Sequence, residues 1–285
     1  MFLSLLIIIP LLTSIGILLS RGLSQVRNVA LLGSVVQLGM GLYLLTEYWQ
    51  ERAAGAASVM MFEYNYTWFE PLKINYHVGV DGISIAMILL TALVVLAGVL
   101  VSWTTEKLSK EFFFLLIFLS LGAYGFFISL DLFTLFFFLE VAVIPKFLLI
   151  GIWGSGKKEY SAMKLALMLM GGSALVFVGL AGLYYNTGTF DIMQLAAMDI
   201  PLGVQQLFFP FAFIGFGIFT ALFPFHTWVP DGHSSAPTAA SMFLAGISMK
   251  LGGYGCLRVA TFLMPDAAAS YSWIIILLAT IAIIY

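Results

Sequence analysis

Charged residues and cysteine are both scarce in this sequence, and each shortage excludes a class of protein. Asp, Glu, Lys and Arg make up only 9% of the 285 residues, whereas soluble domains have about 25%. Too few charges remain to build a water-facing surface, which excludes a soluble enzyme. A formal net charge of −2 offers no basic surface to nucleic acid. The single cysteine, Cys256, excludes an internal disulfide or a CxxC metal or redox pair, and we interpret it as a packing residue.

Apolar residues make up 62% of the chain, and the mean hydropathy of +1.06 is typical of a membrane protein. A spanning helix needs about 20 mostly apolar residues. Eight such segments lie between the charges, at 3–20, 28–48, 82–103, 112–130, 132–153, 163–185, 207–228 and 238–264. We interpret the first as a retained helix rather than a signal peptide, because it has no basic start and Arg21 follows it.

A ninth apolar segment begins near Tyr271 and has 15 residues up to Tyr285. Such a helix rises about 22 Å, against a hydrocarbon core of about 30 Å. We therefore expect the natural protein to be longer than this sequence.

Basic residues are divided unequally between the two sides that these helices define. One side holds three of them, and the other holds seven: Arg21, Arg27, Lys107, Lys110, Lys157, Lys158 and Lys164. Because basic loops stay in the cytoplasm, this count predicts an N-terminus outside the membrane. The longest exterior loop, 47–81, carries five acids and several aromatic residues, and we expect it to lie at the level of the lipid head groups.

Three ionisable residues fall inside the predicted helices, where a charge costs at least about 2.5 to 3.5 kcal/mol and therefore suggests a function. Glu140 lies nine residues into the segment 132–153, and Lys250 lies at a similar depth in 238–264. Together they could form a relay that gains and loses protons. The alternative for Glu140 is a structural role, either as a carboxylate neutralised by a lysine or as a buried, protonated acid. The alternative for Lys250 is a long side chain that reaches the membrane interface.

Lys146 is closer to the cytoplasmic end of its helix, so an extended side chain or a structural ion pair explains it as well as proton transfer does. It is six positions from Glu140, or about 240° around a regular helix, so the two do not share a face. Pro145 between them removes a backbone hydrogen bond and can kink the helix.

Helix 207–228 leads into a run that cannot remain a regular helix, because it contains Pro224, Pro230 and Pro237. Broken helices within a membrane are where transporters place ion sites. His226 and His233 in this run can titrate near neutral pH. Proton transfer and a cytoplasmic capping role, with Asp231 as the partner, are both consistent with the pattern. The spacing of the histidines and the lack of a third ligand argue against a metal site.

Four motifs together resemble one known family. They are GVDGIS at 79–84, DLFTLFFFLE at 131–140, FPFHTWVPDGHSSAPT at 223–238 and GISMKLGGYG at 246–255. In this order they resemble the antiporter-like subunit M of the bacterial proton-pumping NADH:quinone oxidoreductase, respiratory complex I. The resemblance implies an all-α bundle of transmembrane helices built from two inverted five-helix repeats. It divides this chain into three helices and a loop (1–111), a first repeat (112–264) and the start of a truncated helix (265–285).

The resemblance also implies functional residues. The family's helix-5 glutamate and helix-8 lysine match Glu140 and Lys250, but its helix-7 lysine is replaced by Phe219, and a nearby proline by Ala221. We hypothesise that Lys146 supplies the missing positive charge.

By the same resemblance, the chain translocates protons in the bacterial inner membrane, beside neighbouring antiporter-like subunits and peripheral subunits. Quinone reduction elsewhere in the complex drives it, and NADH, FMN, iron–sulfur clusters and quinone belong to those partners, with no cofactor or metal in this chain. A multi-subunit cation/proton antiporter and a non-conducting membrane scaffold remain the alternatives.

Overall fold

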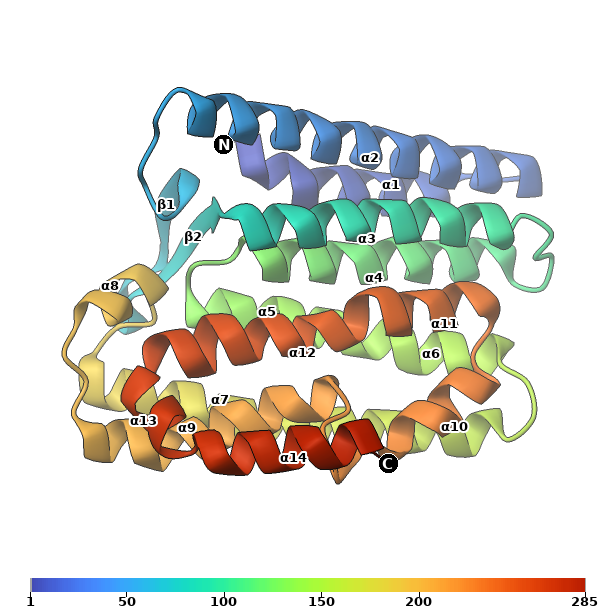
Figure 1. Ribbon diagram of the computed structural model, residues 1–285. Helices are drawn as coiled ribbons and strands as arrows, with labels where there is room; N and C mark the ends of the chain where they lie inside the picture. The colour runs from blue at the N-terminus through green and yellow to red at the C-terminus, as the bar shows by residue number, and fades with distance from the viewer. Residues whose placement is uncertain (1, 285) are drawn as a thin grey trace.

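The computed structural model describes residues 2–284 as a bundle of roughly antiparallel helices (Figure 1). Within these residues, seven helices are long and apolar enough to cross a membrane. The first three are η1 with α1 (Phe2–Ser4 and Leu5–Leu19), α2 (Leu23–Ala53) and α3 (Gly82–Val101). The other four are α4 (Ser109–Ile128), α5 with α6 (Leu132–Val141 and Val143–Trp153), α7 (Lys158–Thr187) and α9 (Leu202–Phe219). The predicted all-α transmembrane bundle is confirmed.

The eighth predicted helix is present as a chain of short pieces that run on from one another in Figure 1. It consists of α11 (Thr238–Phe243), the π-helical η4 (Leu244–Ser248), α12 (Met249–Gly255) and the π-helical η5 (Cys256–Thr261). The π turns widen the helix at two places, which is common where a helix carries functional groups. Two further helices follow, α13 (Pro265–Ser270) and α14 (Ser272–Ile284).

The prediction that residues 47–81 form a loop is wrong in two respects. Helix α2 continues to Ala53, and an antiparallel hairpin of β1 (Met61–Phe69) and β2 (Ile74–Val80) follows, joined by η2 (Glu70–Leu72). Aromatic residues recur along β1, and such side chains favour a pleated strand that is exposed on one side. The loop predicted after the sixth helix also contains a short helix, α8 (Ile192–Ala197).

The predicted break after the seventh helix is confirmed, although it comes earlier than expected. Helix α9 ends at Phe219 rather than near Trp228, and the chain then turns through a 3₁₀ turn, η3 (Phe225–Thr227), into α10 (Trp228–Ser235). The prolines lie where the break requires them. Pro230 is in the first turn of α10, where its missing N–H costs no helical bond, and Pro237 directly precedes α11.

Helix α4 lies at the centre of the bundle, with 83% of its apolar span buried, and it contacts α1, α2, α3, α5 and α6. Elsewhere a glycine lets two helices approach closely. A Cβ atom on Gly252 of α12 would lie 2.4 Å from the carbonyl oxygen of Phe216 in α9. Helix α12 is therefore held directly against the last turn of α9, just before the break.

The two ends of the bundle differ in charge. All seven basic residues of the predicted cytoplasmic side lie in or beside the turns α1–α2, α3–α4 and α6–α7, at one end in Figure 1. The hairpin and α8 lie at the opposite end, which we call the hairpin end. This separation agrees with the sidedness that the sequence predicts, and the orientation in a membrane stays a prediction.

Candidate proton-transfer site

Lys146 is a buried cation in the first turn of α6, with 1% of its surface exposed. Its Nζ atom has no hydrogen-bond partner among residues 2–284. It lies 5.9 Å from the centroid of the Phe219 ring, within the range of a cation–π contact. The side chain therefore does not extend to the surface, and it reaches toward Phe219 at the end of α9.

Glu140 lies in the last turn of α5, just before the interruption at Ala142 that separates α5 from α6. Its side chain is half-buried, and the hydroxyl of Ser173 on α7 donates a hydrogen bond to its Oε1. The Glu140 carboxylate acts electrostatically on Lys146. An acid and a base therefore lie on opposite sides of one helix break, close enough for the charge of one to affect the other.

The backbone after α9 turns at Ala221 in a way that proline could not follow. Ala221 adopts φ 64°, a left-handed conformation. Proline is restricted to φ near −65° and cannot adopt it. Phe219, two residues earlier, ends α9 with its ring buried against Lys146.

Lys250 lies on the exposed face of its helix in the described residues and does not face Glu140, and its predicted depth in a membrane stays a prediction. Its side chain is exposed, and Nζ donates a hydrogen bond to the carbonyl oxygen of Ala245 in the π-helical turn η4. The physical reason is that the buried face of this helix is formed by its neighbours, among them Ile247, Ser248 and Leu251.

The polar residues of the broken segment do not converge on one site. Oδ2 of Asp231 lies 2.6 Å from Nζ of Lys164, a partner that the sequence did not indicate. The Nδ1 atom of His233 is 2.8 Å from the Ser241 hydroxyl, and burial lowers the pKa of this imidazole. His226 stacks on Phe223, near Pro224, beside a hollow of about 420 Å³.

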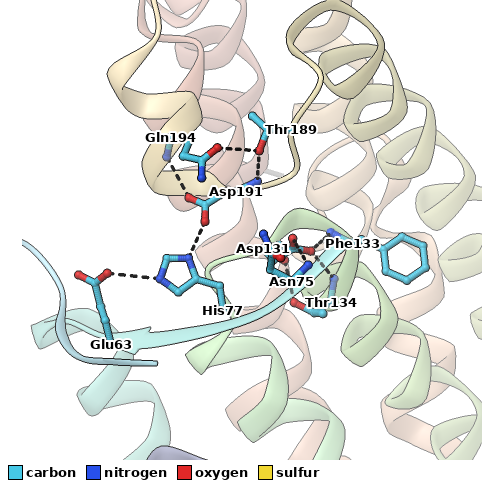
Figure 2. A network of polar contacts seen from close by, with 9 residues as sticks. All are labelled: Glu63, Asn75, His77, Asp131, Phe133, Thr134, Thr189, Asp191 and Gln194. Atoms are coloured by element: carbon cyan, nitrogen blue, oxygen red, sulfur yellow. Dashed lines mark hydrogen bonds and ion pairs between the residues drawn. The ribbon is translucent and has the colours of Figure 1, made fainter. Parts of the chain in front are cut away.

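A polar network at the hairpin end was not predicted from the sequence (Figure 2). The Nδ1 atom of His77 on β2 lies 2.7 Å from Oδ2 of Asp191, and its Nε2 atom lies 3.3 Å from Oε2 of Glu63 on β1. Asp131, beside them, accepts backbone N–H bonds from Asn75, Phe133 and Thr134. Asp131 and Asp191 are the N-caps of α5 and α8.

The network changes the pKa values of its members in opposite directions. Burial raises the pKa of Asp131 to about 6, with a contribution from the neighbouring Asp191 charge. Burial also disfavours the charged forms of Asp191 and His77, but their mutual hydrogen bond and opposite charges outweigh it. The pKa of Asp191 is therefore lowered, and the pKa of His77 is raised.

A further ion pair at this end links α3 to the eighth helix. Arg258, 7% exposed, donates to Oδ2 of Asp81, which caps α3 by accepting the Ser84 N–H. The Tyr254 hydroxyl lies 2.9 Å from Ser84 Oγ and accepts from Arg258 Nε. An Asp before an apolar run is a recognisable N-cap signal, so Asp81, Asp131 and Asp191 could have been identified as caps. Their partners could not be identified from the sequence.

Among residues 2–284 no group of three or more His, Cys, Asp or Glu residues could hold a metal ion.

The fold defines a polytopic membrane protein with ionisable residues among its helices. A family model described as NADH:quinone oxidoreductase/Mrp antiporter, TM, matches residues 129–285. The chain belongs to this family, and the resemblance stated from its motifs is confirmed.

Curated relatives are identical to this chain at about a third of the aligned residues. The NADH-quinone oxidoreductase subunit M of Rickettsia prowazekii is 34% identical over 99% of this chain and 58% of its own length. The NAD(P)H-quinone oxidoreductase chain 4-2 of Synechocystis is 34% identical over 87% of this chain and 45% of its own length. This chain therefore spans about half of the length of these relatives.

Solved structures confirm the fold. A chain of respiratory complex I from Thermus thermophilus superposes with a TM-score of 0.86 at 24% identity, over 99% of this chain and 57% of its own. A chain of the membrane-bound sulfane sulfur reductase, an archaeal respiratory membrane complex, superposes with a TM-score of 0.85 at 23% identity. The match covers 99% of this chain and 58% of that chain.

Proposed function

We propose that this chain is the proton-translocating part of a membrane subunit of an NADH:quinone oxidoreductase. Quinone reduction in other subunits would drive protonation changes here, and NADH, FMN and iron–sulfur clusters would be bound by those partners. The observation that carries the proposal is the buried Lys146 ammonium, which has no hydrogen-bond partner in residues 2–284 and lies within electrostatic reach of Glu140. A buried charge without a hydrogen bond is costly, which is typical of a functional group.

The geometry suggests how the pair would work. A charged Glu140 stabilises the proton on Lys146 Nζ, and Ser173 stabilises the charged Glu140 by donating to Oε1. When Glu140 takes up a proton, that attraction is lost and Lys146 releases its own proton. The ring of Phe219 excludes water from one side of Nζ and interacts with the cation. Lys250 lies on the exposed surface of α12, and its part in the proton path stays a prediction from the sequence.

The first test is Glu140→Gln in the full-length protein within its membrane complex. The substitution keeps the shape and the acceptor for Ser173 but removes the exchangeable proton. Assembly should persist and donor-driven proton uptake into vesicles should fall about a hundredfold. Glu159→Gln, an exposed acid at the start of α7, is the matched control and should pump normally. Normal pumping by Glu140→Gln would contradict the proposal and favour a non-conducting scaffold.

A cation/proton antiporter is the second candidate, because the matching family model describes both kinds of protein. Native-gel separation of gently solubilised membranes, followed by mass spectrometry, separates the two. Co-migration with flavin and iron–sulfur subunits in a band that oxidises NADH supports the first proposal. A smaller band with other hydrophobic subunits and no NADH oxidation supports the antiporter. The proposed setting is the bacterial inner membrane, with the N-terminus outside.

A further inference from the structure

The hairpin end contains a second group of titratable residues, separate from Glu140, Lys146 and Lys250 (Figure 2). The imidazole of His77 lies between two carboxylates, one at each ring nitrogen. On its Nδ1 side the Asp191 side chain is 2% exposed, whereas on its Nε2 side the Glu63 side chain is 43% exposed. One imidazole therefore connects a buried carboxylate to one that meets the solvent.

The buried side of this group continues toward the start of α5. Asp131 is completely buried, pairs with Asp191 through an isolated β-bridge and interacts with its charge. Asp131 caps α5, the helix that carries Glu140 nine residues later. In order of exposure, the acids and the histidine thus run from Asp131 through Asp191 and His77 to Glu63.

We infer that His77, together with Asp191 and Glu63, forms a proton-exchange site through which the hairpin end of the bundle delivers protons to the solvent or takes them up. The inference rests on the proposed function, because it gives the translocated proton a place to leave or enter. A proton from Asp191 binds Nδ1, and the resulting imidazolium loses its other proton from Nε2 to Glu63, which passes it to water. This passage leaves the ring as its Nδ1–H tautomer. Exchange of that proton for one at Nε2 through water restores the starting form before the next passage, so no atom or charge is left over.

Asp131 and Asp191 have a structural role as the N-caps of α5 and α8, but capping does not require the histidine between Asp191 and Glu63. In residues 2–284 no Lys or Arg forms an ion pair with His77, Asp191, Glu63 or Asp131. Within these residues, the basic side chain that pairs with the acids is therefore an imidazole, which can gain and lose a proton. The two carboxylates raise the pKa of His77 above its ordinary value, and burial raises the pKa of Asp131 to about 6.

Direct titration tests the site without reference to pumping. The described chain has three histidines, so ¹⁵N-histidine labelling of the full-length protein in nanodiscs gives few signals, and the signal lost in His77→Gln identifies His77. His77 should titrate above pH 6.5, and Asp191→Asn should lower its midpoint by about 1 to 3 pH units. A His77 midpoint at or below 6.5, or one that Asp191→Asn leaves unchanged, would overturn the inference.

Pumping by the assembled complex gives the second readout. Gln at position 77 can still form hydrogen bonds but cannot carry a proton. His77→Gln should slow proton release at least about tenfold and flatten its dependence on the pH at the hairpin end. Glu63→Gln should slow it too, whereas Glu70→Gln, in the hairpin turn, should not.

The failures of the two proposals are distinguishable. Loss of pumping in Glu140→Gln, with an unchanged rate and pH profile in His77→Gln and Glu63→Gln, overturns the exchange site alone. Unchanged pumping in all of these variants overturns the exchange site and the proposed function together.

Discussion

Replacing Lys146 with methionine should stabilise the folded chain and stop proton transfer at the same time. Burying an ammonium costs several kcal/mol, and the Phe219 ring returns only about 0.5 to 2 kcal/mol. Nζ has no hydrogen bond in residues 2–284 to offset the difference. Methionine fills a similar volume without a charge, so Lys146→Met should raise the free energy of unfolding by about 1 to 4 kcal/mol. Pumping should fall about a hundredfold.

The assay combines thermal unfolding of the purified full-length protein in detergent, followed by tryptophan fluorescence, with proton uptake by vesicles that contain the complex. Lys157→Met, the same change at an exposed position before α7, is the control and should alter stability by no more than about 0.5 kcal/mol. A Lys146→Met protein that melts below the parent and still pumps would refute the reasoning. Lys146 would then be a structural residue.

Three further predictions concern other parts of the structure. Phe219→Lys in the Lys146→Met background should restore part of the pumping, because it returns a cation to the end of α9; a double variant no more active than Lys146→Met would refute a shared role. Gly252→Ala should destabilise the protein by about 1 to 3 kcal/mol, because the new Cβ atom would lie 2.4 Å from a backbone oxygen; unchanged thermal unfolding would contradict that close approach. The raised pKa of His77 stabilises the hairpin at acidic pH, and this stabilisation is lost as the pH rises through the folded-state value. Amide exchange in β1 and β2 should therefore accelerate above neutral pH by more than the intrinsic rate, and should not do so in His77→Gln.

Hydropathy was sufficient to predict the helices of the bundle, because each span is far more apolar than its connections. The hairpin was missed, because the charged and aromatic residues of 47–81 also fit an anchored loop. Its strands are defined by pairing between β1 and β2. That pairing is a contact between two segments rather than a property of either segment alone. The same limit applies to Asp191, whose cap is local but whose partner, His77, is 114 residues away.

Lys250 shows the same limit for a candidate site residue. Depth along a helix can be counted in the sequence, and it placed Lys250 beside Glu140. The face that a side chain occupies depends on which neighbours cover the helix, and the described bundle covers Ser248 and Leu251 instead. Lys146 is the opposite case. Its position near a helix end left an extended side chain, an ion pair and proton transfer as alternatives, whereas the structure buries it against Phe219.

The helix breaks are better guides to the interior site than the charges themselves. Pro145 follows the interruption at Ala142, and Pro224 lies in the break after Phe219. The two breaks meet where Lys146 contacts Phe219, so interrupted backbone and a buried cation occur at one place. Backbone that leaves a helix inside a membrane must be covered by protein or hydrated, and hydration favours proton movement. The cation at this place belongs to α6, which is consistent with the hypothesis that Lys146 supplies the charge that Phe219 lacks.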